Sequence, residues 1–433
     1  MKKFLLLFTF TLLVVVAKPA DHFSTKDYVL ALKKVTDIMV NDATSPVAAA
    51  RYYAYITLAA NEAQSLFYPN TFSFSGKLNK YKGIKAQQET ISKADPSLSV
   101  IYTLFRMGER LLPSGYLLKG QADSVLQAAF QKGIFKENID SSKRLTETVV
   151  QQIMEWVQAD GFRNLSGYKK YTPNSGDDAW QPTAPIFMQA LEPYWNKVRT
   201  LLLDSCSQFK PLPPANFDTA KTSDFYKQMY HVYNAGKTLS KEQKAIAMFW
   251  DCNPFAVQQM GHVEFALKKI SPGGHWIGIT GIACLKKKTP MQQAVFIHAI
   301  VAATLHDAFI SCWDEKYRSN RVRPETAINK WIDPRWRPLL QTPPFPEYSS
   351  GHSVISTASA TILTQLLGDN FQFTDNTETE FGLPSRKFSS FRAAANEAAL
   401  SRLYGGIHYR DAIENGQQQG QRIAEFIIEK LKL

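Results

Sequence analysis

Three short segments in the last third of the chain carry residue types that could bind an oxyanion. The first contains Lys316 and, seven residues later, Arg323, which is followed directly by Pro324. This spacing is about two helical turns, so both cations could project from one face of a helix until Pro324 disrupts it. Two cations that face the same way are suited to binding an anion.

The second segment is a proline-containing approach to a helix, and it ends in Ser350, Gly351 and His352. Helical periodicity begins again at Val354, so these three residues are predicted to lie at a helix N-terminus. Free backbone N–H groups and the helix dipole attract anions at such a position. Ser350 adds a hydroxyl donor, and His352 adds a group that titrates near neutral pH.

The third segment places Arg402 six residues before His408. On one continuous helix these two side chains would point in different directions. The pair Gly405 and Gly406 lies between them and can end the helix and turn the chain back. We therefore expect Arg402 and His408 to reach the same site.

Each of these residues alone could be a solvated charge, a helix cap or a structural histidine. Their order and spacing together resemble the pattern of the vanadium haloperoxidase and type-2 phosphatidic acid phosphatase superfamily. That pattern is a Lys, six residues and Arg-Pro, then Ser-Gly-His, then Ser-Arg, five residues and a His, as found from Lys316 to His408. The resemblance is most specific over residues 313–411. Residues 180–185 and 191–195 are similar to segments of bacterial haloperoxidase-like proteins.

The chain departs from this pattern at two positions. Ser349 stands where a proline is common before Ser-Gly-His, which removes a rigid turn residue but no hydrogen-bond donor. Ala412 replaces the acidic residue that commonly follows the last histidine by four positions. Asp411 is then the candidate to orient His408, a role that affects how basic the imidazole is.

The resemblance implies one of two chemistries. As a haloperoxidase, the chain would hold vanadate with His408 as the direct protein ligand to the metal, which acts as a Lewis acid. His352 would deprotonate hydrogen peroxide, Lys316 would polarise the bound peroxide, and halide would be oxidised to hypohalous acid. The residues implied to bind the oxygens of vanadate are Lys316, Arg323, Ser350, Gly351 and Arg402.

As an acid phosphatase, the chain would bind phosphate in the same site. His408 would attack the phosphoryl group of a phosphomonoester, His352 would protonate the leaving oxygen, and the cations would stabilise the transition state. The haloperoxidase is favoured, because large aromatic residues at positions matching Trp313 and Phe345 line the halide side of the pocket in haloperoxidases of this superfamily. Phe345 also favours a chloro- or iodoperoxidase, and soluble phosphatases of the superfamily are generally shorter.

A third hypothesis, an inactive oxyanion-binding protein, is disfavoured because such a protein would not need both His352 and His408. No catalytic role is assigned to His262, His275, His298 or His306. The last two lie on an apolar helix, where a structural role is the commoner one.

The four cysteines are widely spaced and contain no CxxC pair that would indicate a zinc or redox motif. They are Cys206, Cys252, Cys284 and Cys312. In an exported protein they could form disulfides, and the alternative is free thiols buried in the core.

Apolar residues recur at helical spacing along most of the chain, and strand-like alternation is scarce. The sequence therefore predicts an all-α fold, a multi-helix bundle of the vanadium haloperoxidase and acid phosphatase type. Pro290 indicates a helix start and Gly368 a helix stop. The predicted helices cover residues 27–40, 47–64, 144–158, 241–249, 291–317, 354–367, 390–404 and 416–433. A boundary near Thr238 would separate an N-terminal helical layer, residues 18–238, from a catalytic helical domain, residues 239–433.

The first residues have the pattern of an export signal. Lys2 and Lys3 precede an apolar run that ends near Ala17, which predicts a signal peptide over residues 1–17. No later segment is both apolar and long enough for a membrane span, so we expect a periplasmic or secreted protein. Homo-oligomers are an expectation by analogy with the family only. The net charge of +12 comes without dense basic runs, so it favours small anions over nucleic acid.

Overall fold

The computed structural model describes residues 21–433, apart from residues 69, 185, 255–256, 261–262 and 267–268. The predicted signal peptide, residues 1–17, and His262 lie outside the described residues. Within the described residues the chain forms fourteen α-helices, four short 3₁₀ helices and two small hairpins of strands. The predicted all-α class is confirmed.

The helices fall into two runs separated by a long irregular segment. The first run is α1 (Thr25–Asn41), α2 (Pro46–Ser65), α3 (Gln88–Lys93), α4 (Pro96–Leu111), α5 (Lys119–Gln131) and α6 (Lys136–Gln158). The second run is α7 (Asp224–Lys237), α8 (Lys241–Phe249), α9 (Pro272–Lys286), α10 (Met291–Ser319), α11 (Pro324–Trp331), α12 (Gly351–Leu367), α13 (Phe391–Tyr404) and α14 (Arg410–Leu431). The 3₁₀ helices are η1 (Gly115–Leu118), η2 (Phe162–Gly167), η3 (Trp195–Lys197) and η4 (Thr379–Phe381). The strands pair antiparallel, β1 (Val257–Met260) with β2 (Val263–Ala266) and β3 (Phe373–Asp375) with β4 (Arg386–Phe388).

All eight helices predicted from periodicity are present, although α6 and α14 begin several residues earlier than predicted. The periodicity does not predict α3, α4, α5, α7, α9 and α11. Helix α9 shows why, since most of its residues are buried and it has no polar face to set a helical period.

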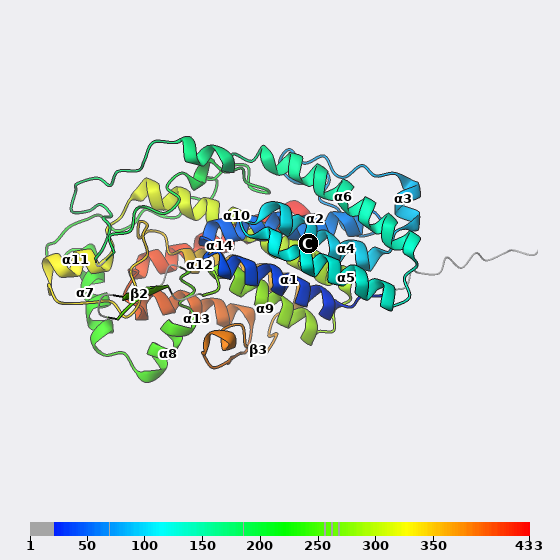
Figure 1. Ribbon diagram of the computed structural model, residues 1–433. Helices are drawn as coiled ribbons and strands as arrows, with labels where there is room; N and C mark the ends of the chain where they lie inside the picture. The colour runs from blue at the N-terminus through cyan, green and yellow to red at the C-terminus, as the bar shows by residue number, and fades with distance from the viewer. Residues whose placement is uncertain (1–20, 69, 185, 255–256, 261–262, 267–268) are drawn as a thin grey trace, which may run out of the picture.

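Helix α10 lies at the centre of the bundle. It packs against α2, α9 and α12, and α12 packs in turn against α13 and α14. Figure 1 shows α2, α10, α12 and α14 running side by side through the middle of the molecule. Among the described residues, α10 is the one helix long and apolar enough to cross a membrane, but 94% of its most apolar window is buried inside the protein. It is the central core helix of the bundle.

The largest hydrophobic core draws residues from both sides of the predicted boundary near Thr238. Ile56 of α2 and Ile300 of α10, for example, belong to the same buried cluster. The two layers therefore share apolar packing, and their division into domains stays a prediction.

All four cysteines are free thiols, so none of the disulfides that the sequence left open is formed. Cys252, Cys284 and Cys312 are buried, and Cys206 is partly exposed. The alternative of free thiols is the one that the structure has.

Several chain turns needed for the site form as predicted. Helix α12 begins at Gly351 with Ser350 as its N-cap, and it stops at Gly368, whose φ is 103°. Helix α13 ends at Tyr404, and the chain reverses at Gly406, whose φ of 75° favours glycine.

The expectation that Lys316 and Arg323 share a helix face is wrong. Helix α10 ends at Ser319, because Asn320 adopts a left-handed backbone with φ of 48°. Arg323 is instead the N-cap residue of α11, and Pro324 is the first residue of that helix. The two cations thus come from two different helix ends.

Candidate active site

The hydrogen bonds of His408 fix which of its ring nitrogens carries the proton. Nε2 lies 3.2 Å from Nη1 of Arg323, and Nδ1 lies 2.9 Å from Oε1 of Glu347. A guanidinium can only donate, so Nε2 accepts from Arg323 and Nδ1–H donates to Glu347. His408 therefore presents an unprotonated Nε2, the form of imidazole that can bind a metal centre or attack phosphorus.

The surroundings of His408 also keep it neutral. The side chain is buried, and its pKa is lowered well below the usual range by burial and by the charges of Arg323 and Lys316. Glu347 is in contact with the ring, but its carboxylate does not outweigh these effects. The imidazole thus keeps an unprotonated Nε2 at neutral pH.

The prediction that Asp411 orients His408 is wrong. Asp411 instead lies 2.6 Å from Nη1 of Arg321. Glu347 takes the orienting position, and the same Oε1 that accepts from His408 also accepts from the backbone N–H of Tyr409 at 2.9 Å. A sequence signal for this role existed, since Glu347 is the one acidic residue in the proline-containing segment 338–350.

Lys316 holds the loop that leads into α12. Its buried Nζ donates to the carbonyls of Pro346 and Glu347, both at 3.1 Å, and to that of Ser349 at 2.5 Å. An ammonium group has three protons, so these carbonyls use all of them. Lys316 thereby fixes the shape of a segment that has no regular secondary structure.

Arg323 joins this loop to the turn before α14. Its Nε donates to the carbonyl of Phe345 at 2.9 Å, and its Nη1 donates to the carbonyl of Ile407 at 2.8 Å. The same Nη1 contacts His408, so one guanidinium positions the loop, the turn and the imidazole.

Arg402 and His352 meet at one backbone carbonyl. Nη2 of Arg402 donates to the carbonyl of Trp250 at 2.7 Å, and His352 also forms a hydrogen bond with the Trp250 backbone. Nε2 of His352 is buried and has no partner among the described residues. Burial, Arg402 and His408 lower the pKa of His352 well below its usual range, so the unpartnered nitrogen is a free base.

Three of the predicted cations are buried without an acidic partner. In the part of the chain that the structure describes, Lys316, Arg323 and Arg402 form no salt bridge. Burial lowers the pKa of Lys316 to about 8 and that of Arg323 to about 10, and it also lowers the pKa of Arg402. The nearby carboxylates of Glu347 and Asp251 do not outweigh the effect of burial on these cations. Buried charge of this kind is costly, so the cluster is suited to a ligand of negative charge.

Ser350 connects the start of α12 to α14, and Gly351 lies beside Trp313. The Ser350 N–H donates to the Ala412 carbonyl at 3.0 Å, and its Oγ accepts from the Ser353 hydroxyl at 2.9 Å. A Cβ added at Gly351 would lie 3.7 Å from the Trp313 ring, so the first turn of α12 passes close to that indole. The N-terminus of α12 therefore faces the cluster of cations with its dipole favouring an anion.

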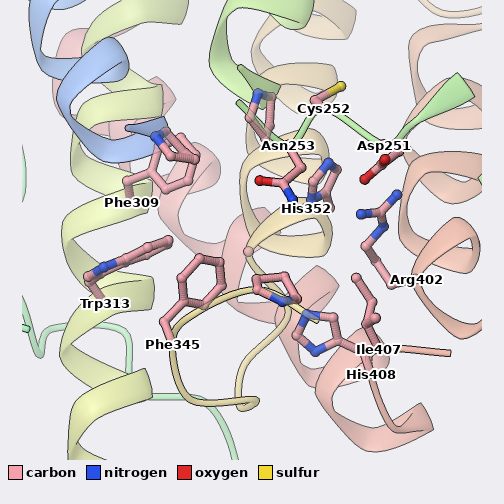
Figure 2. Close-up of a pocket in the computed structure, with 14 residues that line it drawn as sticks. Asp251, Cys252, Asn253, Phe309, Trp313, Phe345, His352, Arg402, Ile407 and His408 are labelled. Carbon is pink, nitrogen blue, oxygen red and sulfur yellow. The ribbon is translucent and has the colours of Figure 1, made fainter. Parts of the chain in front are cut away.

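A narrow cavity opens at this cluster. Figure 2 shows its aromatic wall on one side and its histidines and Arg402 on the other. Six of the predicted site residues line it: Trp313, Phe345, Gly351, His352, Arg402 and His408. Lys316, Arg323 and Ser350 are not among its lining residues and act on it through the loop and His408. Trp313 and Phe345 lie with ring centroids 4.9 Å apart.

The remaining described histidines lie away from this cavity lining. His298 bonds the Ala294 carbonyl at 2.7 Å, and His306 bonds the Arg199 carbonyl at 3.0 Å. Both are buried in the core. His275 belongs to a separate buried group that includes Cys252, a lining residue of the cavity that the sequence does not single out.

Comparison with known proteins agrees with this arrangement. Residues 296–433 match the family model of the VCPO second helical-bundle domain. The fold is similar to a bacterial vanadium-dependent iodoperoxidase, with 40% identity, a TM-score of 0.89, and coverage of 95% of this chain and 98% of that one. A bacterial vanadium-dependent chloroperoxidase in its holo form has the same fold at 16% identity and a TM-score of 0.67, covering 96% of each chain. No curated protein sequence matches.

The match to the iodoperoxidase extends over nearly the whole of both proteins. Its 40% sequence identity is well above the 16% of the chloroperoxidase that has the same fold. Because His408, the cations around it and the start of α12 also come together as that resemblance predicts, sequence and structure lead to one assignment. The chain belongs to the vanadium-dependent haloperoxidase family.

Proposed function

We propose that the chain is a vanadate-dependent haloperoxidase that oxidises halide with hydrogen peroxide and a proton to give hypohalous acid and water. The observation that carries this proposal is the set of three buried cations, none in a salt bridge among the described residues, around a neutral histidine with an unprotonated Nε2. The similarity to a vanadium-dependent iodoperoxidase supports it. The comparisons do not favour the phosphatase alternative.

The residues present fit vanadate. Its oxygens carry negative charge, and Lys316, Arg323 and Arg402 supply buried positive charge that no direct salt bridge among the described residues neutralises. His408 would be the protein ligand through Nε2, while the Ser350 hydroxyl and the Gly351 N–H add donors at the start of α12. When bound, vanadate supplies a Lewis acid that activates peroxide without a change of oxidation state. Lys316 and Arg323 now donate hydrogen bonds to backbone carbonyls. The oxygens of vanadate would replace these carbonyls as acceptors.

The proton chemistry falls to His352 and Lys316. The unpartnered Nε2 of His352 can take a proton from hydrogen peroxide as it enters, because the ring is neutral and its other nitrogen is bonded to Trp250. Lys316 would add positive charge near the bound oxyanion and so make peroxide a better electrophile. Phosphate could occupy the same cage, since it presents a similar set of oxygens.

The aromatic wall is the proposed halide side of the cavity. Phe309, Trp313 and Phe345 line it together with Ile407. Apolar side chains do not replace the hydrogen bonds that an anion makes with water, and the resulting cost is smallest for a large, weakly hydrated anion. We propose iodide as the preferred halide, as the related iodoperoxidase suggests. Export to the periplasm or beyond, and assembly into homo-oligomers, remain proposals from sequence and family analogy.

The test is one preparation of the mature chain assayed for two activities. The protein is stripped of bound oxyanion, reloaded with orthovanadate, and assayed for peroxide-dependent oxidation of iodide, bromide and chloride and for hydrolysis of a phosphomonoester. We expect halide oxidation that depends on added vanadate, with iodide fastest. Phosphomonoester hydrolysis that vanadate inhibits, without halide oxidation, would overturn the proposal.

Replacement of Glu347 by glutamine should weaken the enzyme without unfolding it. The amide of Glu347→Gln can still accept from the Nδ1–H of His408, but it lacks the charge that makes Nε2 a better ligand. A residue that orients a metal-bound histidine typically contributes about 10–100-fold in metal affinity or activity. Vanadate titration of iodide oxidation measures the change, and Asp411→Asn is the control that should retain orientation of His408. Equal losses in both variants would contradict the assignment of Glu347.

A further inference from the structure

A second group of ligand atoms lies behind the wall of the cavity. Sγ of Cys252 is 3.3 Å from Nδ1 of His275 and 3.7 Å from Oε1 of Glu378, and that Nδ1 is 3.2 Å from the same Oε1. All three side chains are buried. A thiol, an imidazole nitrogen and a carboxylate oxygen thus converge on one point inside the protein.

The imidazole of His275 is held so that Nδ1 faces this point. Its Nε2 lies 2.7 Å from Oδ2 of Asp375, a carboxylate that is itself fixed by the backbone N–H and hydroxyl of Thr377. The ring also stacks on Trp250, with centroids 4.5 Å apart and planes 16° apart. A carboxylate behind a histidine is the usual support for a metal-bound imidazole.

We propose that Cys252, His275 and Glu378 form a zinc site, with Asp375 orienting the imidazole. Zinc bonds of ordinary length in a tetrahedral arrangement place sulfur, nitrogen and oxygen ligands about 3.4–3.6 Å from one another. The three separations of 3.3, 3.7 and 3.2 Å are close to those values, so the ligands need little rearrangement. Three protein ligands leave a fourth position for water.

Zinc binds a thiolate and an unprotonated imidazole nitrogen. The ion would therefore displace any proton on Sγ of Cys252 and on Nδ1 of His275, and these protons would pass to solvent. The carboxylate of Glu378 supplies the remaining protein ligand, at 3.2 Å from Nδ1 of His275.

The orientation of the Cys252 side chain favours metal binding over reaction with oxidants that form in the cavity. In Figure 2 the sulfur of Cys252 points away from His352 and from the aromatic wall. Cys252 is a lining residue of the cavity, and its sulfur lies against His275 and Glu378. The sulfur is therefore placed to bind an ion rather than to meet peroxide or hypohalous acid.

The zinc ion would join three segments that are distant in sequence, the end of α8, helix α9 and the turn after β3. Trp250, which stacks on His275, carries the carbonyl that accepts from Arg402 and His352. The metal thus supports the wall of the cavity from behind, and this role does not depend on vanadate.

The test measures metal content and does not require activity. Full-length protein, free of vanadate, is incubated with zinc, passed through gel filtration and analysed for metal, and a parallel sample is loaded with cobalt. We expect about one zinc per chain and a thiolate-to-cobalt absorption band in the near ultraviolet. Cys252→Ser should lose both, while Cys284→Ser, which removes another buried thiol, should keep both. Asp375→Asn should weaken zinc binding by about 10–100-fold.

Two results would overturn the proposal. One is wild-type protein that retains no zinc and gives no cobalt–thiolate band, which decides the matter even where a variant fails to fold. The other is a folded Cys252→Ser protein that binds zinc as tightly as wild type. Because no halide assay enters, failure of the haloperoxidase proposal would leave this result unchanged.

Discussion

His408→Ala is expected to abolish vanadate-dependent halide oxidation. The imidazole provides the single protein ligand proposed for the metal, and Nη1 of Arg323, which now bonds Nε2, would lose that partner. Removal of a group that touches the reacting centre typically costs about 10³-fold or more in kcat/KM. Iodide oxidation at increasing vanadate concentrations would show whether activity can be restored by mass action, and we expect that it cannot.

The matched control is His231→Ala, which removes an exposed histidine of α7. It should retain wild-type activity and vanadate affinity. A His408→Ala protein that keeps more than a small fraction of the vanadate-dependent activity would show that another residue ligates the metal. The loss must also occur in folded protein, which circular dichroism establishes.

The largest effect on stability is expected for Asp160→Ala. Oδ2 of Asp160 lies 2.6 Å from Nε of Arg51, and the two side chains are 1% and 3% exposed. The guanidinium carbon also lies 4.3 Å from the ring centroid of Phe162. Removal of the carboxylate leaves a buried cation without its partner, which typically destabilises a protein by about 3–5 kcal/mol. Urea unfolding, followed by circular dichroism, measures this as a lower midpoint.

Asp177→Ala is the control for this measurement. Asp177 pairs with Lys330 on the surface, where the side chains are 52% and 49% exposed. Exposed pairs contribute about 0–1 kcal/mol, so its unfolding midpoint should stay close to that of wild type. Similar midpoints for the two variants would mean that Arg51 finds other partners when Asp160 is absent.

The sequence predicted the residues of the site better than their partners. Spacing identified Arg402, His408 and the start of α12, because a helix N-cap and a glycine turn have local signatures. The contact between Glu347 and His408 joins residues 61 positions apart, and no local pattern encodes it. Asp411 was the nearer acid in sequence, but the first turn of α14 directs it to Arg321.

The same limit applied to the buried group around His275. Its ligands lie in three segments, and Cys252 and Glu378 are 126 residues apart. Only the packing of α9 against β3 and the end of α8 brings them together, so cysteine spacing gave no sign of a metal site. For α9 itself, burial on most sides removed the amphipathic pattern that revealed the other long helices.

Helix α10 is 29 residues long and therefore spans about 43 Å. Its last turns carry Trp313 and Lys316, while the N-terminal helix α2 packs along it. Pro46, the first residue of α2, also lines the cavity. The N-terminal helices thus contribute both to the packing of α10 and to the cavity itself, so a substitution that displaces α2 is expected to change the shape of the cavity.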